Sequence, residues 1–341
     1  MAYSDDDKRR VLEATDIVSL IGEHVALKRV GRRWTAICPF HNEDTPSLSV
    51  NAEQGLYYCF GCHASGDSLT FVMETYRMGF QEALEHLAQR AHITLTPLSK
   101  ADSESRSRRE QLLGIVGRAA ELYVSYLQDP VIGARAREYL SSRGISEEAI
   151  RHFRVGFAPS GGRSLQDQLR VPAQDLADAG LAYLDDRQPA RARDHFFGRV
   201  MFPISDTSGR VIGFGGRVLP ELQTPREGGA PIAKYKNSPE TEIYHKRRVL
   251  YGLDLARSEI VNASEIVVCE GYTDVIGFWQ SGVARAVATC GTALSEEHFD
   301  RMKNFAKRIV LAFDADGAGQ EAAERLYQME QRHNLQIAVA K

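Results

Sequence analysis

The chain contains thiol and imidazole side chains with the spacing of metal ligands. Cys38-Pro-Phe-His41 and Cys59-Phe-Gly-Cys62 each separate two ligand residues by two positions. That gap lets both side chains of a pair reach one ion while the backbone turns, and two pairs supply the four ligands of a closed tetrahedral Zn²⁺ site. A Cys₃His set leaves no open coordination position, so we expect one structural zinc that folds a small domain and does not catalyse a reaction. The paired spacing argues against ordinary core or surface residues.

Cationic and aromatic side chains surround the predicted zinc ligands. Such a mixture is suited to stacking on unpaired bases while holding phosphate groups. A ribbon this small also needs rings for its core, so packing and base stacking are equally open for any one ring, and strand alternation places Tyr57 and Tyr58 on opposite faces. We take Arg33, Trp34 and Tyr58 as the candidates for nucleic-acid contact. The full set is Arg32, Arg33, Trp34, Phe40, Tyr57, Tyr58 and Phe60.

Carboxylates follow two apolar segments near the end of the chain. Glu270 comes directly after the strand-like run EIVVC, and Asp314-Ala-Asp316 follows RIVLAF. In open α/β sheets ligands bind outside the carboxyl ends of the strands, so these acids should face one crevice. Clustered carboxylates repel one another unless a cation lies between them, and oxygen ligands suit Mg²⁺ or Mn²⁺. Glu270, Asp314 and Asp316 are therefore the predicted catalytic metal ligands for phosphoryl chemistry, and solvated loop acids are the alternative.

The middle of the chain supplies cations just upstream of these acids. Arg199, Arg217, Lys234 and Lys246 lie in GRVMFPI, GFGGRVL, AKYKNSPET and YHKRRVLYGL. Cations beside an acidic metal site would suit a triphosphate and a template backbone, and we expect these four to line one track leading to the acids. The glycines of IGFGGR lack the strand and helix context of a dinucleotide fingerprint, and we interpret them as a tight hairpin.

The composition is that of a globular protein with more than one domain. The 341 residues are 43% hydrophobic and 26% charged, with Lys+Arg 42 against Asp+Glu 45 and a net charge of −3. A polyanion site must therefore be a local patch. No apolar run reaches the ~20 residues that span a bilayer, and the charged start MAYSDDDKRR is no secretory signal, so we expect a cytoplasmic protein without membrane contact. Three of the five cysteines lie in the predicted zinc site, which favours metal over disulfides.

The order of helical and extended segments predicts a multidomain α+β and α/β protein that positions these groups. Helices and a small antiparallel ribbon form a zinc-ribbon domain over 1–98. The polar stretch SKADSESRSRRE predicts a flexible linker over 99–110. A helix from Gln111 opens a mixed α+β subdomain over 111–262. Alternating strands and helices over 263–341 predict a parallel sheet built from βαβ units.

In this combination and order the motifs resemble the bacterial replicative DNA primases of the DnaG type. GRRWTAICPFHNEDTPSLSV with YYCFGCHASGD is similar to the zinc ribbon of that family. FRVGFAP, GRVMFPISDTSGRVIGFGGRVL, KYKNSPET and HKRRVLYGL are similar to the N-terminal part of its polymerase core, and EGYTDVI with FDADGAG to its TOPRIM metal fold. The resemblance implies synthesis of short RNA primers from ribonucleoside triphosphates on a single-stranded DNA template at the replication fork.

The resemblance also assigns roles to individual residues. It implies that Glu270, Asp314 and Asp316 are metal-binding acids, while Asp274 matches an acid of the EGYxD motif. By the same matching, basic residues facing template or nucleotide fall at Arg199, Arg217, Lys234 and Lys246.

The chain departs from the family pattern at two points. His63 stands where a glycine is usual after the last zinc cysteine. The sequence stops at Lys341, whereas the family continues with another acidic pair, a small helical subdomain and a C-terminal domain that docks the replicative helicase. We therefore expect a fragment that makes little primer by itself and does not bind the helicase.

Other proteins with a similar acidic fold provide the alternatives. A phage- or organelle-type primase-helicase would share this front half and add a P-loop ATPase downstream. A topoisomerase would need a tyrosine nucleophile in a separate domain. A non-catalytic zinc-ribbon module that binds single strands is the third alternative, but such a module gains nothing from repulsion among clustered acids.

Overall fold

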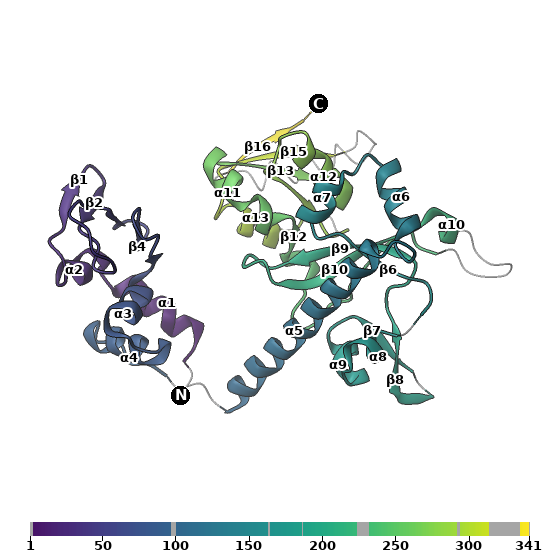
Figure 1. Cartoon of the computed structure of the whole chain (residues 1–341), viewed down its shortest axis with the longest axis horizontal. Coiled ribbons are helices and arrows are strands. Elements are labelled where there is room, and N and C mark those ends of the chain that lie inside the picture. Colours follow the sequence, from purple (N-terminus) through teal and green to yellow (C-terminus); the bar gives the residue numbers. More distant parts are fainter. Residues whose placement is uncertain are drawn as a thin grey trace. The chain divides into compact units, whose positions relative to one another are not determined.

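The computed structural model divides the chain into two compact units, Met1–Ser107 and Arg108–Lys341. Figure 1 shows the elements of both units. The structure describes residues 3–96, 100–162, 164–185, 187–223, 232–291, 294–313 and 335–340. None of the helices described there is long and apolar enough to cross a membrane.

The first unit is an antiparallel ribbon with strand order β1-β2-β3-β4-β5, packed against short helices. The Ser4 hydroxyl caps the first helix by accepting the N–H of Asp7, and the Asp67 carboxylate caps the third by accepting the N–H of Thr70. Apolar side chains of helices and strands form one core beneath the ribbon. The predicted ribbon and flanking helices are thus confirmed. The elements are α1 (Asp5–Ala14), α2 (Ile17–Gly22), β1 (Lys28–Val30), β2 (Arg33–Ala36), β3 (Leu48–Asn51), β4 (Leu56–Cys59), β5 (Ser65–Gly66), α3 (Ser68–Tyr76) and α4 (Phe80–Arg90).

The stretch predicted as a flexible linker is helical. Helix α5 covers Lys100–Gln128, so it begins well before Gln111, and the division between the two units falls inside it. Arg, Lys, Glu and Ser are all compatible with a solvated helix, and the buried side chains of Leu112 and Val116 anchor the following turns. Polar composition alone did not distinguish such a helix from a linker.

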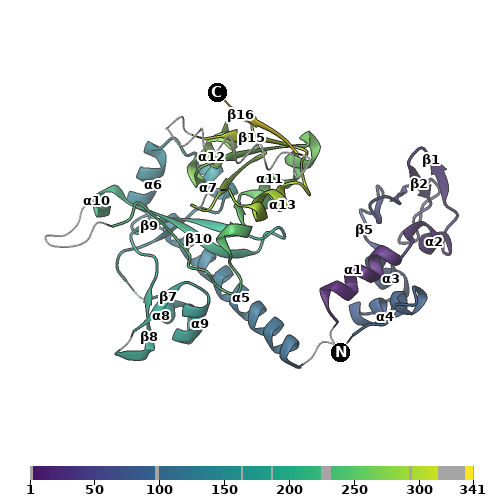
Figure 2. The ribbon, with the colours of Figure 1, turned by 180° about the vertical axis from the view of Figure 1, so that it is seen from behind.

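The second unit contains two larger sheets side by side (Figures 1 and 2). One is antiparallel, with strand order β11-β10-β9-β6. The other has the order β12-β14-β13-β15-β16, in which β14, β13, β15 and β16 are parallel and β12 is an antiparallel edge. This arrangement confirms the predicted fold class, including the parallel sheet near the end of the chain.

Short helices and a two-stranded ribbon, β7-β8, complete the second unit. Its elements after α5 are α6 (Ala134–Ser142), α7 (Glu147–His152), β6 (Gly156–Ala158), α8 (Leu165–Leu169), α9 (Ala173–Asp178), β7 (Ala182–Asp185), β8 (Gln188–Asp194), β9 (Arg199–Ser205), β10 (Val211–Val218), α10 (Pro220–Gln223), β11 (Tyr235–Asn237), η1 (Lys246–Arg248), β12 (Leu250–Tyr251), α11 (Leu253–Ala263), β13 (Glu265–Cys269), α12 (Tyr272–Gln280), β14 (Ala286–Thr289), α13 (Glu296–Met302), β15 (Arg308–Ala312) and β16 (Gln336–Val339).

The glycines of IGFGGR lie inside strand β10, so their interpretation as a tight hairpin is wrong. The turn between β9 and β10 lies upstream, where Gly209 has a φ of 80°. A Cβ on Gly215 would come within 2.2 Å of Tyr272 Cζ. A Cβ on Gly213 would lie 3.2 Å from the Tyr244 ring. These glycines therefore admit aromatic rings against the strand.

One hydrophobic core joins the two sheets of the second unit. It includes Phe202 and Phe214 from the antiparallel sheet together with Cys269 and Tyr272 from the parallel region. The rings of Phe202 and Tyr272 stack with centroids 5.2 Å apart. The boundary predicted near residue 262 stays a prediction, because packing is continuous across it.

Candidate functional site

The four predicted zinc ligands converge on one point of the first unit. Their ligand atoms all lie within 4.8 Å of one another. Cys38 Sγ is 3.8 Å from Cys62 Sγ, and Cys59 Sγ is 3.9 Å from His41 Nδ1. Zn–S bonds of about 2.3 Å in a tetrahedron put neighbouring sulfur atoms ~3.8 Å apart. The donor set and its spacing therefore fit a tetrahedral Zn²⁺ ion.

Glu43 is not one of the four predicted ligands, but its carboxylate hydrogen-bonds to residues of the site. Its Oε2 lies 3.2 Å from His41 Nε2, while Oε1 accepts the N–H of Cys38 at 2.7 Å. Oε1 also accepts the hydroxyl of Ser47 at 2.8 Å. A carboxylate on Nε2 fixes the tautomer that leaves Nδ1 free for a metal. The sequence analysis did not identify Glu43, because no spacing rule distinguishes it from the neighbouring Asp44.

Burial and hydrogen bonding act differently on the thiols. Burial raises the pKa of Cys38 to about 12. Burial also opposes ionisation of Cys59, but the Ser47 hydroxyl and the N–H groups of Cys62 and Gly61 lower the pKa of Cys59 to about 6. Zinc ligands must be thiolates, so the charge of the ion is needed to ionise Cys38. Metal binding here should therefore release protons.

The ribbon places its aromatic residues on two faces, as strand alternation predicts. Tyr57 is 2% exposed and belongs to the core, whereas Tyr58 and Phe60 are 38% and 65% exposed. The Tyr58 and Phe60 rings meet edge to face, with centroids 5.0 Å apart. Arg33 is exposed and Trp34 is partly buried against the core. Arg33 and Tyr58 are therefore accessible to a ligand. Trp34 packs partly against the core and is only partly exposed.

The turn after the last zinc cysteine explains why a glycine suits this place. His63 has a φ of 61°, in the left-handed region that favours glycine. Its Nδ1 lies 2.8 Å from the Tyr58 hydroxyl, a hydrogen bond that holds the imidazole beside the exposed rings. The departure thus leaves the ligand geometry intact and adds a contact on the exposed face.

Glu270 lies at the carboxyl end of strand β13, as predicted. The parallel register pairs Cys269 with Ala312, so the segments that follow β13 and β15 leave the sheet at the same edge. The side chain of Glu270 is exposed at this edge. Asp314 and Asp316 lie outside the described residues.

The turn after Glu270 is fixed by a helix cap. The N–H of Gly271 donates to Asp274 Oδ2 at 2.9 Å, which closes the first turn of α12. Asp274 therefore positions the backbone next to Glu270. The Tyr272 hydroxyl from the same turn donates to Asn237 Oδ1 at 2.8 Å and ties β11 to this edge.

Two of the predicted basic residues, Arg199 and Arg217, approach the backbone carbonyl group of a third, Lys234. Arg199 Nη1 and Arg217 Nη1 lie 3.5 Å and 3.4 Å from that oxygen. Arg199 is only 3% exposed and also donates to Gly216 O and Ala233 O at 3.0 Å. The Arg217 guanidinium lies over a tyrosine ring at 5.2 Å. Arg199 thus bonds neighbouring strands together and is not accessible to a ligand, whereas Lys234 is exposed.

A second group of polar residues, which we call the His195 cluster, links these cations to the parallel sheet. It consists of His195, Lys236, Asn237 and Lys246. Lys236 Nζ donates to His195 O at 2.9 Å, and Asn237 Nδ2 donates to Cys290 O, just beyond β14, at 2.6 Å. Burial, with the charges of Lys236, Arg199 and Lys246 added, lowers the pKa of His195 to about 4. The charges of Lys246 and Arg199 therefore both act on His195.

The sequence motifs did not identify His195 and Asn237 as site residues. The motif KYKNSPET was singled out for its lysines, and the link made by Asn237 becomes visible only when β11 and β14 are placed together. The buried His195 had no motif of its own.

Family models match the chain in three consecutive parts. A CHC2 zinc finger matches residues 3–103, the N-terminal domain of the DNA primase catalytic core matches 122–257, and a Toprim domain matches 264–341. A DNA primase of Pseudomonas aeruginosa is 40% identical over 92% of the chain.

Solved structures agree with this assignment. The zinc-binding and RNA polymerase domains of the Aquifex aeolicus primase superpose with a TM-score of 0.60 at 29% identity, covering 99% of this chain and 79% of that one. A DnaG primase catalytic domain bound to ssDNA has a TM-score of 0.60 at 37% identity, covering 69% of this chain and 71% of that one. The chain belongs to the DnaG family of DNA primases.

Membership of the DnaG family confirms the resemblance drawn from the motifs. The chain spans about half the length of the curated relatives it matches, 47% for the Pseudomonas aeruginosa DNA primase. The Toprim match implies use of a divalent metal.

Proposed function

We propose that this chain contributes the zinc-ribbon and polymerase parts of an enzyme that makes short RNA primers on single-stranded DNA. The proposal rests above all on Glu270, which lies at the carboxyl end of a parallel strand next to the His195 cluster. The Asn237 side chain donates to Cys290 O, just after β14, and accepts the hydroxyl of Tyr272, which follows Glu270 by two residues. These hydrogen bonds connect the His195 cluster to the sheet edge that carries Glu270. Positive charge beside metal-binding acids suits nucleotide triphosphates. The relatives named DNA primase support the same reaction.

The metals of this proposal are one structural Zn²⁺ and one or more catalytic Mg²⁺ or Mn²⁺ ions. Cys38, His41, Cys59 and Cys62 would hold the zinc. Glu270 would bind the catalytic ion, together with the predicted ligands at 314 and 316. A divalent cation there would bridge substrate phosphates and lower the pKa of the attacking hydroxyl.

The substrates of this proposal are a single-stranded DNA template and ribonucleoside triphosphates. Arg33, Trp34 and Tyr58 would contact template bases and phosphates on the ribbon. Lys236 and Lys246 would hold phosphates near the acids, and Arg199 and Arg217 would support them from within the sheet. Action at the replication fork and contact with the replicative helicase rest on the family resemblance, and that contact is expected outside these residues. A DnaG primase catalytic domain solved in complex with ssDNA supports a DNA template.

Labelled ribonucleotide incorporation tests this function. The wild-type chain, from which little primer is expected, is given a single-stranded DNA template with Mg²⁺ or Mn²⁺ in a long incubation, and its small amount of product is compared with that of Glu270→Gln. Because a lost metal ligand misplaces the reacting groups, we expect incorporation to fall ~100-fold or more. Glu259→Gln is the matched control, since Glu259 is exposed on α11 and should leave incorporation unchanged.

Two outcomes would contradict the proposal. Equal incorporation by wild type and Glu270→Gln would reject the role of Glu270. Template binding without incorporation by the wild type, even with Mn²⁺, would favour the alternative of a non-catalytic single-strand-binding module. Nothing in the comparisons favours a primase-helicase or a topoisomerase.

A further inference from the structure

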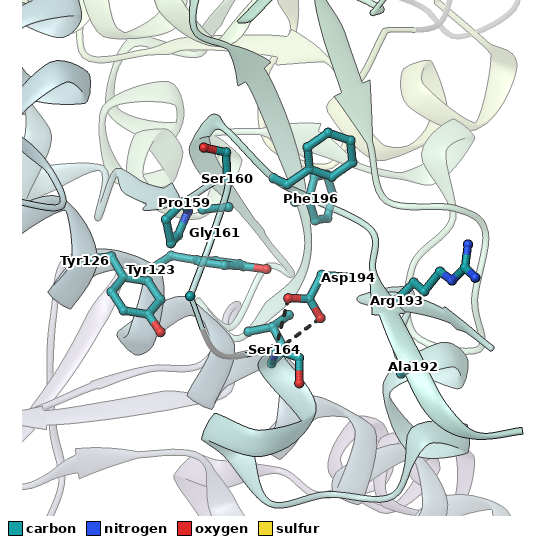
Figure 3. Close-up of a pocket in the computed structure, with 14 residues that line it drawn as sticks. Tyr123, Tyr126, Pro159, Ser160, Gly161, Ser164, Ala192, Arg193, Asp194 and Phe196 are labelled. Carbon is teal, nitrogen blue, oxygen red and sulfur yellow. Dashed lines mark hydrogen bonds between the residues drawn. The ribbon is translucent and has the colours of Figure 1, made fainter. Parts of the chain in front are cut away.

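A cavity of about 390 Å³ opens in the second unit beside helix α5. Figure 3 shows its lining side chains, which come from α5, the loop after β6 and the end of strand β8. The volume lies within the range of roughly 300–1,000 Å³ that is usual for small-ligand sites. None of the predicted template, nucleotide or metal residues lines it.

The inner end of the cavity carries unusual polar groups. The Tyr123 side chain is 2% exposed, and its hydroxyl has no hydrogen-bond partner among the described residues. In Figure 3 this hydroxyl points into the cavity toward Asp194. Leaving a buried hydroxyl unpaired costs about 1–3 kcal/mol, so a ligand that bonds to it recovers that free energy.

Asp194 presents a carboxylate to the same space. Both of its oxygens accept the N–H of Leu165, at 3.1 and 3.2 Å, and no ion pair to Asp194 occurs within the part of the chain that the structure describes. Burial raises the pKa of this carboxyl, and the charge of Asp167 adds to the effect. The neighbouring Arg193 is committed to Asp185, with Nη2 to Oδ2 at 2.9 Å. The carboxylate therefore retains lone pairs for a ligand with N–H donors.

Aromatic rings form the walls around these polar groups. Tyr126 and Phe196 line the cavity, and the half-exposed ring of Phe197 lies among its lining residues. Phe196 and Tyr123 are each held edge to face against Phe214, at 6.2 and 5.3 Å between centroids. Rings fixed in this way favour a flat aromatic ligand.

A short segment, Asp194 to Phe196, separates this cavity from the proposed reaction site. Asp194 and Phe196 line the cavity, whereas His195 between them contacts Asn237 and Lys236 on the other side. The cavity is thus a separate site behind the His195 cluster.

We propose that this cavity binds a free nucleoside or nucleotide through a planar base with adjacent N–H donors, and that guanine is the base that fits. The N1–H and 2-amino groups of guanine can donate to both carboxylate oxygens of Asp194 in a charge-assisted pair. Adenine and cytosine place a ring-nitrogen acceptor beside their amino group, and that acceptor would face the carboxylate. The Tyr123 hydroxyl supplies a further polar contact, and the aromatic walls hold the ring.

Equilibrium dialysis of radiolabelled guanosine against the 341-residue chain tests the proposal. A nucleoside is used because it carries no phosphate for the proposed metal site. We expect saturable binding of guanosine, weaker binding of inosine, which lacks the 2-amino group, and no binding of adenosine. Asp194→Asn should weaken guanosine binding at least tenfold, while its amide oxygen still accepts the N–H of Leu165.

Glu138→Gln is the matched control. It removes an exposed carboxylate of α6 that does not line the cavity, so guanosine binding should change less than twofold. Ser160→Phe provides a second variant, because Ser160 is exposed at the lining and a ring there should block entry without disturbing the core. Glu270→Gln should bind guanosine as the wild type does.

Three results would overturn the proposal. Guanosine that does not bind the wild type up to its solubility limit would exclude the site. Equal affinity in wild type and both cavity variants would place guanosine elsewhere. Loss of binding in Glu270→Gln alone would assign it to the metal edge, whereas failure of the proposed polymerase reaction would leave the dialysis result unaffected.

Discussion

A single carboxylate joins the two halves of the zinc site. Glu43 lies against the Nε2 of His41 from the first knuckle, and through Ser47 it reaches Cys59 of the second, since Ser47 Oγ lies 3.1 Å from Cys59 Sγ. Outer groups of this kind orient the ligands and hold the histidine in one tautomer. The zinc affinity of the ribbon should therefore depend on a residue that does not touch the metal.

We predict that Glu43→Gln lowers zinc affinity by roughly 10–100-fold, the usual effect of losing an outer-layer partner. Competition with a chromophoric chelator measures this. Asp44→Asn is the control, because it removes the same charge one position away from an exposed side chain. Equal zinc affinity in the two variants would show that Glu43 has no positioning role.

His195 should make stability depend on pH. Its native pKa of about 4 lies below the ordinary value of 6.5, so the native state holds the neutral form. As pH falls through this window the unfolded chain gains a proton that the native chain does not bind, and stability declines until about pH 4. Burial is the main cause of the lowered pKa of His195, and the positive charges of Lys236, Arg199 and Lys246 add to it. Tyr183 packs on the imidazole ring.

We predict that His195→Gln removes part of this decline. Glutamine retains an N–H that can donate to Asn237 O but does not titrate. Between about pH 7 and about pH 5 the wild type should lose up to ~2 kcal/mol more unfolding free energy than the variant. Urea unfolding at both pH values measures the difference, and parallel losses would contradict the assignment.

At the scale of residues, sequence spacing predicted the four zinc ligands but not the residues that support them. Two short knuckles identify their own ligands because the ligands are neighbours in sequence. Glu43, His195 and Asn237 act through contacts between segments distant in sequence, so no local pattern marks them. The buried state of Arg199 was hidden for the same reason.

Strand β10 shows how one element depends on absent side chains. Gly215 lies on its face toward Tyr272, whose ring occupies the space a Cβ would take. The Tyr272 hydroxyl then reaches Asn237 at 2.8 Å and ties β11 to the sheet edge that bears Glu270. The glycine thus helps to position the proposed reaction site.

We predict that Gly215→Ala destabilises the second unit by about 1–3 kcal/mol, the usual cost of overpacking a core. Gly114→Ala is the matched control, since Gly114 lies within helix α5 with nothing within 4 Å of its added Cβ. Alanine in a helix interior should instead stabilise by about 0.5–1 kcal/mol. Chemical unfolding compares the two, and equal effects would contradict the packing argument.

At the scale of elements, the apolar strands were predictable and the polar helix was not. The segments EIVVC and RIVLAF are short apolar runs between helical stretches, a pattern that is typical of buried parallel strands. The start of α5 has no apolar face, so only its continuation into Leu112 and Val116 makes it helical. The glycines of β10 resembled a turn because the rings that explain them are far away in sequence.

The two compact units have separate hydrophobic cores. One core cluster contains residues such as Leu20, Val50 and Phe71, and another contains residues such as Phe202 and Phe214. The sequence predicted a division near residue 100, since apolar periodicity is interrupted there. Separate cores mean that each unit can lose its structure without the other.

We predict that Cys59→Ser unfolds the first unit and leaves the second folded. Cys59 is fully buried and is one of four zinc ligands, so the variant loses the metal and a core side chain together. Removing a structural zinc commonly unfolds a small domain, because the binding free energy is part of the folding free energy. Hydrogen exchange should show strands β2 to β4 exchanging as an unfolded chain, with β9, β10 and β13 protected as in the wild type.

Cys269→Ser is the reciprocal control, since the buried Cys269 thiol donates to Val287 O in the second unit. It should lower protection in β13 and leave the ribbon unchanged. Loss of protection in both units from either variant would show that the two cores fold as one.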